Sequence, residues 1–234
     1  MTELTAIAPD IWLVEGDCVS FYGFPYPTRS VVVRLADGGL WFWSPLKFDA
    51  QLKAALDELG EVRHLVSPNK LHHLFMGDWQ RRYPQAHTWG PQSTIDKRSD
   101  ITFDRPALSE PAPEEWAKEI EQVWIHGSPF MDEVLFFHKA SRTLIMADFS
   151  ENFSKTFLKR HWPFWARPIA SLWKIVEGFG YAPLEWRLSF RDKSLLREAK
   201  ARLLAADPEN VVMAHGVWQK GKGRAFLERA LAWI

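Results

Sequence analysis

The sequence predicts an α/β fold in which strands and helices alternate along the chain. Short runs of valine, leucine and aromatic residues at 31–35 and 40–44 predict strands. Residues 48–59 carry leucine and alanine at helical spacing and end at Gly60, a residue type typical of helix ends. A further apolar run at 62–66 and a second helical pattern follow. This alternation is typical of layered α/β domains.

The first half of the chain predicts a β-hairpin followed by alternating helices and strands. The ADGG sequence at 36–39 is a hairpin turn between the two strands just named. The GFPYPT sequence at 23–28 has two prolines and predicts a loop. The other elements expected here are strands at 11–14, 19–22, 62–66 and 86–89 and a helix at 74–83.

The second half predicts more strands, a long insertion and two C-terminal helices. Residues 91–115 are rich in proline and polar residues and predict a surface excursion, and residues 186–190 predict an extended segment. Strands are expected at 120–125, 133–138, 143–147 and 210–214, and helices at 193–204 and 223–234.

Composition restricts the class of protein. Among 234 residues the net charge is zero, which gives no electrostatic basis for a nucleic-acid partner. The expected partner is a small-molecule substrate or ligand, which is what the resemblance described below implies. A single cysteine, Cys18, excludes an internal disulfide framework. The sequence MTELTAIAPD lacks the basic start and apolar run of a signal peptide, and no run has the ~18 apolar residues of a membrane span. We therefore expect a cytoplasmic protein.

Histidine or aspartate residues recur where predicted strands end. His72 and His73 follow the strand at 62–66, His126 follows the strand at 120–125, Asp148 follows the strand at 143–147, and His215 follows the strand at 210–214. Side chains at the carboxyl ends of strands are where α/β proteins usually place their chemistry. Imidazole nitrogens with one carboxylate suit zinc, or iron or manganese. These five residues are the predicted metal ligands.

The order of these elements resembles the metallo-β-lactamase fold. TLIMADF resembles that superfamily's strand ending in Asp148, VVMAHG resembles its last ligand segment with His215, and HGSPFMDEVLFF resembles the segment that begins with His126. The whole pattern, with SPNKLHHLF and SRTL, also resembles the DUF4336 family. This resemblance implies one αββα four-layer sandwich over residues 1–234. It also implies a metal-dependent hydrolase acting on an ester, thioester, lactone or phosphoester.

One segment departs from the superfamily's pattern, which reads His-x-His-x-Asp-His after a Thr or Ser. Pro68 and Lys70 stand at the first two histidine positions, His72 stands at the aspartate position, and only His73 matches outright. Two alternatives follow. In the first, a rearranged metal site uses His72. In the second, the metal is lost, Lys70 supplies a positive charge in the cleft, and the protein binds a small ligand without hydrolysing it.

Residues 149–183, called the insert below, are rich in aromatic and basic residues. We expect two helical pieces broken at Pro163 and Pro168. An aromatic helical segment after a catalytic strand favours a lid that shapes the substrate pocket. The alternative is a helix that lies on a membrane surface through its tryptophans and basic side chains.

Overall fold

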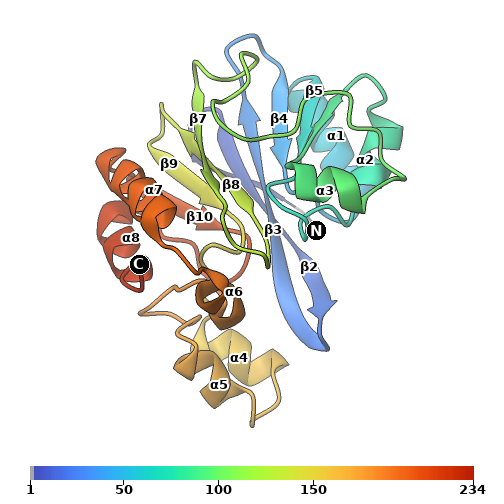
Figure 1. The fold of residues 1–234 in the computed structure, drawn as a ribbon. Helices are drawn as coiled ribbons and strands as arrows, with labels where there is room; N and C mark the ends of the chain where they lie inside the picture. The colour runs from blue at the N-terminus through green and yellow to red at the C-terminus, as the bar shows by residue number, and fades with distance from the viewer. Residues whose placement is uncertain (1–2) are drawn as a thin grey trace.

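The computed structural model of the protein describes residues 3–234 and contains two β-sheets that face each other, with helices on both outer sides (Figure 1). The first sheet has six strands in chain order: β1 (Leu4–Ala8), β2 (Ile11–Phe21), β3 (Phe24–Arg34), β4 (Leu40–Trp43), β5 (Val62–Val66) and β6 (His87–Trp89). β1 to β4 pair antiparallel, whereas β4, β5 and β6 are parallel. The parallel pairs require crossover connections, which contain α1 (Ala50–Leu59) and α2 (Met76–Arg82).

The second sheet has four strands in the order β10-β9-β8-β7. Its strands are β7 (Ile120–Ile125), β8 (Glu133–His138), β9 (Thr143–Met146) and β10 (Asn210–Met213). β7, β8 and β9 pair antiparallel, and β10 pairs parallel with β9. The remaining helices are α3 (Gln92–Lys97), α4 (Lys155–His161), α5 (Arg167–Leu172), α6 (Leu184–Ser189), α7 (Ser194–Ala205) and α8 (Gly223–Ala230).

Three clusters of buried apolar side chains fill the spaces between the four layers, which are two sheets with helices on each outer side. Between the sheets, Trp41 is fully buried and meets Phe136 and Trp116 at ring-centroid distances of 5.0 and 6.2 Å. A second layer packs α1 and α2 on the first sheet, and a third packs α6, α7 and α8 on the second. The predicted αββα sandwich is therefore confirmed. No helix within residues 3–234 combines the length and hydropathy needed to cross a lipid bilayer.

Two of the strand and loop predictions are wrong. Pro25 and Pro27 lie within β3 rather than in a loop, and β4 pairs only with residues 31–34, so the prolines face an edge where no ladder hydrogen bond is lost. Residues 186–190 lie mostly in α6, where the buried Trp186 packs on Phe149. The segment 91–115 does run over the surface as predicted, with all but four of its residues exposed or half-buried, and it also contains α3.

Candidate metal centre

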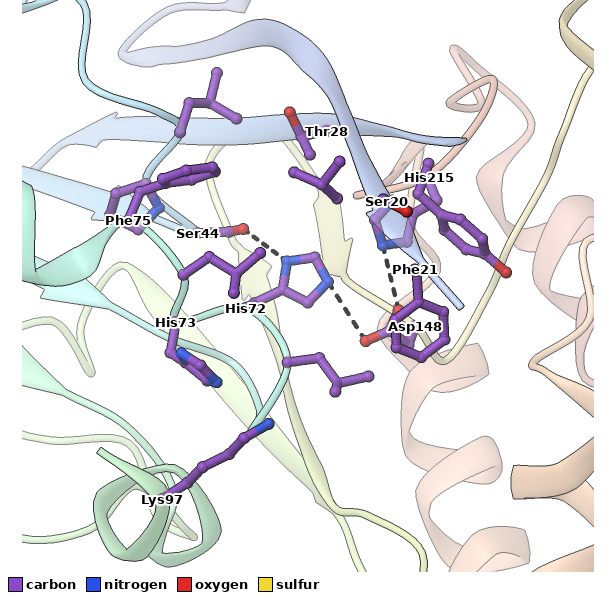
Figure 2. Close-up of a pocket in the computed structure, with 16 residues that line it drawn as sticks. Ser20, Phe21, Thr28, Ser44, His72, His73, Phe75, Lys97, Asp148 and His215 are labelled. Carbon is purple, nitrogen blue, oxygen red and sulfur yellow. Dashed lines mark hydrogen bonds and ion pairs between the residues drawn. The ribbon is translucent and has the colours of Figure 1, made fainter. Parts of the chain in front are cut away.

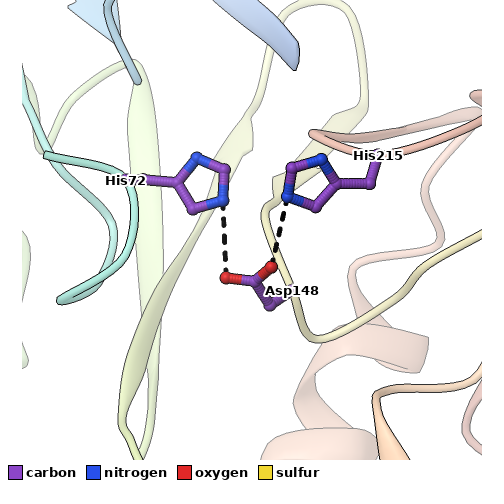
Figure 3. Close-up of side chains that lie close together, drawn as sticks. All are labelled: His72, Asp148 and His215. Carbon is purple, nitrogen blue, oxygen red and sulfur yellow. Dashed lines mark ion pairs between the residues drawn. The ribbon is translucent and has the colours of Figure 1, made fainter. Parts of the chain in front are cut away.

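Three of the predicted ligands come together at one edge of the two sheets. His72 follows β5, Asp148 follows β9 and His215 follows β10. Nε2 of His72 lies 3.4 Å from one Asp148 carboxylate oxygen, and Nε2 of His215 lies 3.3 Å from the other (Figure 3). One ligand atom from each residue falls within 4.8 Å of the others.

The second nitrogen of each histidine is fixed by a hydrogen bond. Nδ1 of His215 lies 2.7 Å from the carbonyl oxygen of Pro27, and because a carbonyl only accepts, Nδ1 carries the hydrogen. Nδ1 of His72 lies 2.8 Å from the hydroxyl of Ser44, a residue held at a left-handed φ of 48°. Both Nε2 atoms therefore point at the Asp148 carboxylate.

The His215 side of this arrangement needs positive charge, whereas the Ser44 hydroxyl can donate to or accept from His72. A neutral imidazole whose Nδ1 is protonated presents a lone pair at Nε2, and a lone pair facing a carboxylate is repulsive. Although burial favours the neutral acid, the two histidines hold the pKa of the Asp148 carboxyl well below its usual range. A cation among the three side chains would satisfy the His215 lone pair and the carboxylate together. Two nitrogens and one carboxylate fit a divalent cation.

Asp148 is held in place by two buried side chains that the sequence did not reveal. The amide of Asn69 donates to Asp148 at 2.8 Å and to Glu133 at 2.9 Å. Glu133 in turn accepts from the backbone N–H groups of Ala147 and Asp148. Burial and the adjoining Asp148 carboxylate raise the pKa of Glu133. Asp148 is thus oriented by its neighbours, as ligands of metal sites usually are.

Asn69 also shapes the loop that carries His72. Its side-chain oxygen accepts from the backbone N–H groups of Leu71 and His72 at 2.8 and 3.2 Å. The hydroxyl of Ser67 donates to the carbonyl oxygens of Asn69 and His72. These bonds fold the SPNKLH sequence into a tight turn, and one asparagine connects both sides of the candidate centre.

A buried arginine fixes the loop that carries His215. Arg29 donates to the carbonyl oxygens of Met213 and Gly216, and its guanidinium pairs with Glu15 at 2.7 Å. Gly216 has a φ of 90°, and a Cβ there would lie 2.2 Å from the carbonyl oxygen of Asn152. Only glycine fits at this position.

The structure places the other candidates outside the three-residue cluster. Nδ1 of His73 lies 2.7 Å from the guanidinium of Arg98, which only donates, so this nitrogen acts as an acceptor there. Burial, with Lys97 and Arg98 nearby, lowers the pKa of His73 to about 4. His126 stacks on Trp124 with ring centroids 4.0 Å apart. Lys70 donates to the carbonyl oxygen of Phe130.

A cavity of about 370 Å³ lies above the cluster (Figure 2). Its polar side includes His72, Asp148 and His215, and among the described lining residues Lys97 of α3 is the one lysine or arginine. Most other wall residues are apolar: Val19, Phe21, Leu46, Leu71, Leu74 and Phe75. Among the described residues, none from 149–183 lines the cavity. The insert therefore does not shape the pocket directly, as a lid would.

Comparison with known proteins identifies the family. A family model described as "Domain of unknown function (DUF4336)" matches residues 9–158. This chain belongs to the DUF4336 family. No curated protein matches this DUF4336 chain.

Solved structures give the fold. DIM-1 metallo-β-lactamase superposes with a TM-score of 0.66 and 14% identity over 99% of this chain and 96% of that one. The metallo-β-lactamase from Pontibacter korlensis gives 0.64 and 14% over 100% and 98%. The rubredoxin oxygen:oxidoreductase of Desulfovibrio gigas gives 0.63 and 13% over 98% of this chain and 61% of that one. The DUF4336 chain has the metallo-β-lactamase fold, and these neighbours with the His/Asp cluster suggest divalent metal binding.

Proposed function

We propose that this chain is a metal-dependent hydrolase whose divalent ion is held by His72, Asp148 and His215. The observation that carries the proposal is the convergence of two imidazole Nε2 atoms on one buried carboxylate beside a cavity. Catalytic zinc sites use three protein ligands of this kind and keep another position open. We therefore propose zinc, while iron and manganese accept the same donors.

A bound ion of this kind polarises a carbonyl or phosphoryl oxygen and makes water acidic enough to ionise near neutral pH. The protein's own side chains supply the rest. The Pro27 carbonyl and the Ser44 hydroxyl hold the two imidazole rings in their orientations. Asn69 donates to the Asp148 carboxylate and Glu133 accepts from the Asp148 backbone N–H, so the donor set is arranged before any ligand arrives.

The cavity walls support a substrate with an apolar part. Aliphatic and aromatic side chains face the space next to the cluster, and Lys97 is the one lysine or arginine among the described residues that line it. Apolar walls bind hydrocarbon and exclude water, whereas a phosphoester needs several cationic or N–H donors. Of the ester, thioester, lactone and phosphoester substrates that the sequence suggested, we therefore favour those with an apolar acyl group.

The deciding experiment is metal analysis of the purified protein by inductively coupled plasma mass spectrometry. We expect about one ion per chain in the wild type, since three ligands make a mononuclear site. The variants H72A, D148A and H215A lose it, while H73A and H126A, matched histidine controls outside the cluster, retain it. Loaded protein is then assayed with p-nitrophenyl esters from acetate to octanoate and with bis(p-nitrophenyl) phosphate. We expect the octanoate ester to give the highest kcat/KM.

The alternative is a repurposed relative that binds a small ligand in the same cavity without hydrolysis. Pro68 and Lys70 in place of two superfamily histidines favour it, because the cluster then has three ligands among residues 3–234. Wild-type protein that stays metal-free after reconstitution with zinc, iron and manganese refutes the hydrolase and leaves this alternative. Metal retained in H215A refutes the proposed ligand set.

A further inference from the structure

The insert exposes large apolar side chains at one end of the molecule. Phe164, Trp165, Ile169 and Leu172, called the insert patch below, lie in α5 and the segment before it. Phe164 and Leu172 are 79% and 78% exposed, and Trp165 is 55% exposed. Figure 1 shows α4 and α5 projecting beyond both sheets at that end. A cluster of this size on a folded surface indicates a binding site for an apolar partner.

The charge around the insert patch is predominantly positive. In a chain whose net charge is zero, residues 149–183 contain five lysines and arginines against two glutamates, of which Glu151 is buried and Glu177 is exposed. Lys155, Lys159 and Arg160 are exposed. Within residues 3–234, none of the five basic side chains has a carboxylate within ion-pairing distance. Positive charge beside exposed aromatic and aliphatic groups is complementary to an anionic, apolar interface.

The insert patch stands on a rigid support. The indole N–H of Trp162 donates to the Pro25 carbonyl at 2.9 Å, and its ring meets the Phe24 ring at 4.8 Å. The Trp165 ring also contacts Phe24, at 5.9 Å. The insert is thereby fixed to the β2–β3 hairpin, which also contributes Phe21 and Tyr26 to the cavity wall. The exposed groups are therefore held outward by packing beneath them.

We propose that the insert patch docks the protein on an anionic lipid bilayer surface. Phe164, Trp165 and Leu172 enter the boundary between headgroups and acyl chains, while the surrounding lysines and arginines contact lipid phosphates. A lipid surface fits better than a protein partner because the exposed apolar side chains stand beside exposed lysines and arginines, a combination complementary to anionic lipid. The same hairpin joins the docked surface to the cavity, which brings the cavity close to molecules dissolved in the bilayer.

The test is co-sedimentation of the full chain with vesicles in 150 mM salt. Vesicles of phosphatidylcholine alone are compared with vesicles in which one third of the lipid is phosphatidylglycerol. We expect binding to the anionic vesicles at least about tenfold tighter than to the neutral ones, because several basic side chains act together. F164S/L172S should weaken anionic binding about tenfold or more through the loss of buried apolar area. K159E/R160E should do the same.

Two matched variants control for general effects. L195S removes an exposed leucine of α7, and K118E/K220E reverses two exposed lysines outside the insert, so each should leave vesicle binding within about twofold of the wild type. Circular dichroism verifies that all variants are folded. Metal content is measured in parallel and should not change, because the insert patch and the metal cluster share no residues. Absence of binding to anionic vesicles overturns the proposal. An equal loss of vesicle binding in the control variants overturns the proposal as well. If the protein self-associates through the insert patch and does not bind lipid, the insert patch is an interface with a second copy of the chain instead.

Discussion

Asn69→Ala tests whether one buried amide organises the candidate metal centre. The Asn69 side chain makes four hydrogen bonds: two donated to the carboxyl groups of Glu133 and Asp148, and two accepted from the backbone of the His72 loop. A hydrogen bond to a charged group contributes about 1.5–3 kcal/mol and a neutral one about 1 kcal/mol. The four share partners and are not additive, so we expect a loss of about 3–5 kcal/mol in the free energy of unfolding.

The assay has two arms. Urea unfolding of chelator-treated protein measures stability without any contribution from metal. Competition with a chromophoric chelator measures zinc affinity, which we expect to fall about 10- to 100-fold, the usual effect of removing a side chain that orients a ligand. The matched control is Asn210→Ala, another buried asparagine, which makes one long and one ordinary hydrogen bond far from the cluster. It should cost about 1–2 kcal/mol and leave zinc affinity unchanged.

The reasoning is refuted if Asn69→Ala is as stable as Asn210→Ala and binds zinc as the wild type does. A loss of stability with unchanged zinc affinity would mean that the amide serves the loop alone. It would also mean that Asp148 keeps its place through the Glu133 bond to its backbone N–H without help from Asn69.

Three further predictions concern stability and the His215 loop. Burial lowers the pKa of His64 to about 4 from 6.5, so the His64 contribution to the free energy of unfolding is present above pH 6.5 and is lost as pH falls toward 4, by up to about 3 kcal/mol. Urea unfolding at pH 7.5 and 4.5 should therefore show a smaller difference in stability for His64→Gln than for the wild type. Equal differences contradict this prediction. Gly216→Ala should lower the free energy of unfolding by about 2–3 kcal/mol and reduce bound metal, because the new Cβ meets a backbone oxygen at 2.2 Å. The control Gly178→Ala, with a similar φ and open space around it, should lower it by about 1 kcal/mol. Similar losses in the two variants would mean that the close contact is unimportant. Trp41→Ala, between the sheets, should cost about 3–5 kcal/mol and exposed Trp165→Ala under about 1 kcal/mol in thermal or urea unfolding, and a mild effect at Trp41 would contradict the inter-sheet core.

The sequence predicted the layers because its strongest local patterns coincide with its tertiary contacts. The hairpin of β3 and β4, the helix that ends at Gly60 and the strands that precede Asp148 and His215 each follow from short-range periodicity. The two prolines of β3 misled the prediction. Their tolerance depends on which strand edge is free, and that is a property of the sheet rather than of the segment.

The candidate centre was partly predictable, for the same kind of reason. Strand ends identified Asp148 and His215, and the motif register raised His72 as a replacement ligand. Which of the adjacent histidines faces the cluster could not be read from the sequence, because the choice depends on the Asn69 hydrogen bonds and on Arg98, 25 positions beyond His73. The sequence pattern did not identify Glu133 either. Its role depends on accepting from the backbone N–H groups of Ala147 and Asp148, which the fold places beside it at the end of β9.

The His215–Pro27 hydrogen bond has a consequence for the order in which the protein is built. Its two partners are separated by 188 residues, and the bonds from Arg29 span nearly the same distance. At roughly 5–20 residues per second, the ribosome needs about 10–40 s to make the chain between them. The β2–β3 hairpin therefore waits for its last neighbour long after its own synthesis. The candidate centre is completed only when the end of β10 has left the ribosome, so its assembly marks a late step of folding.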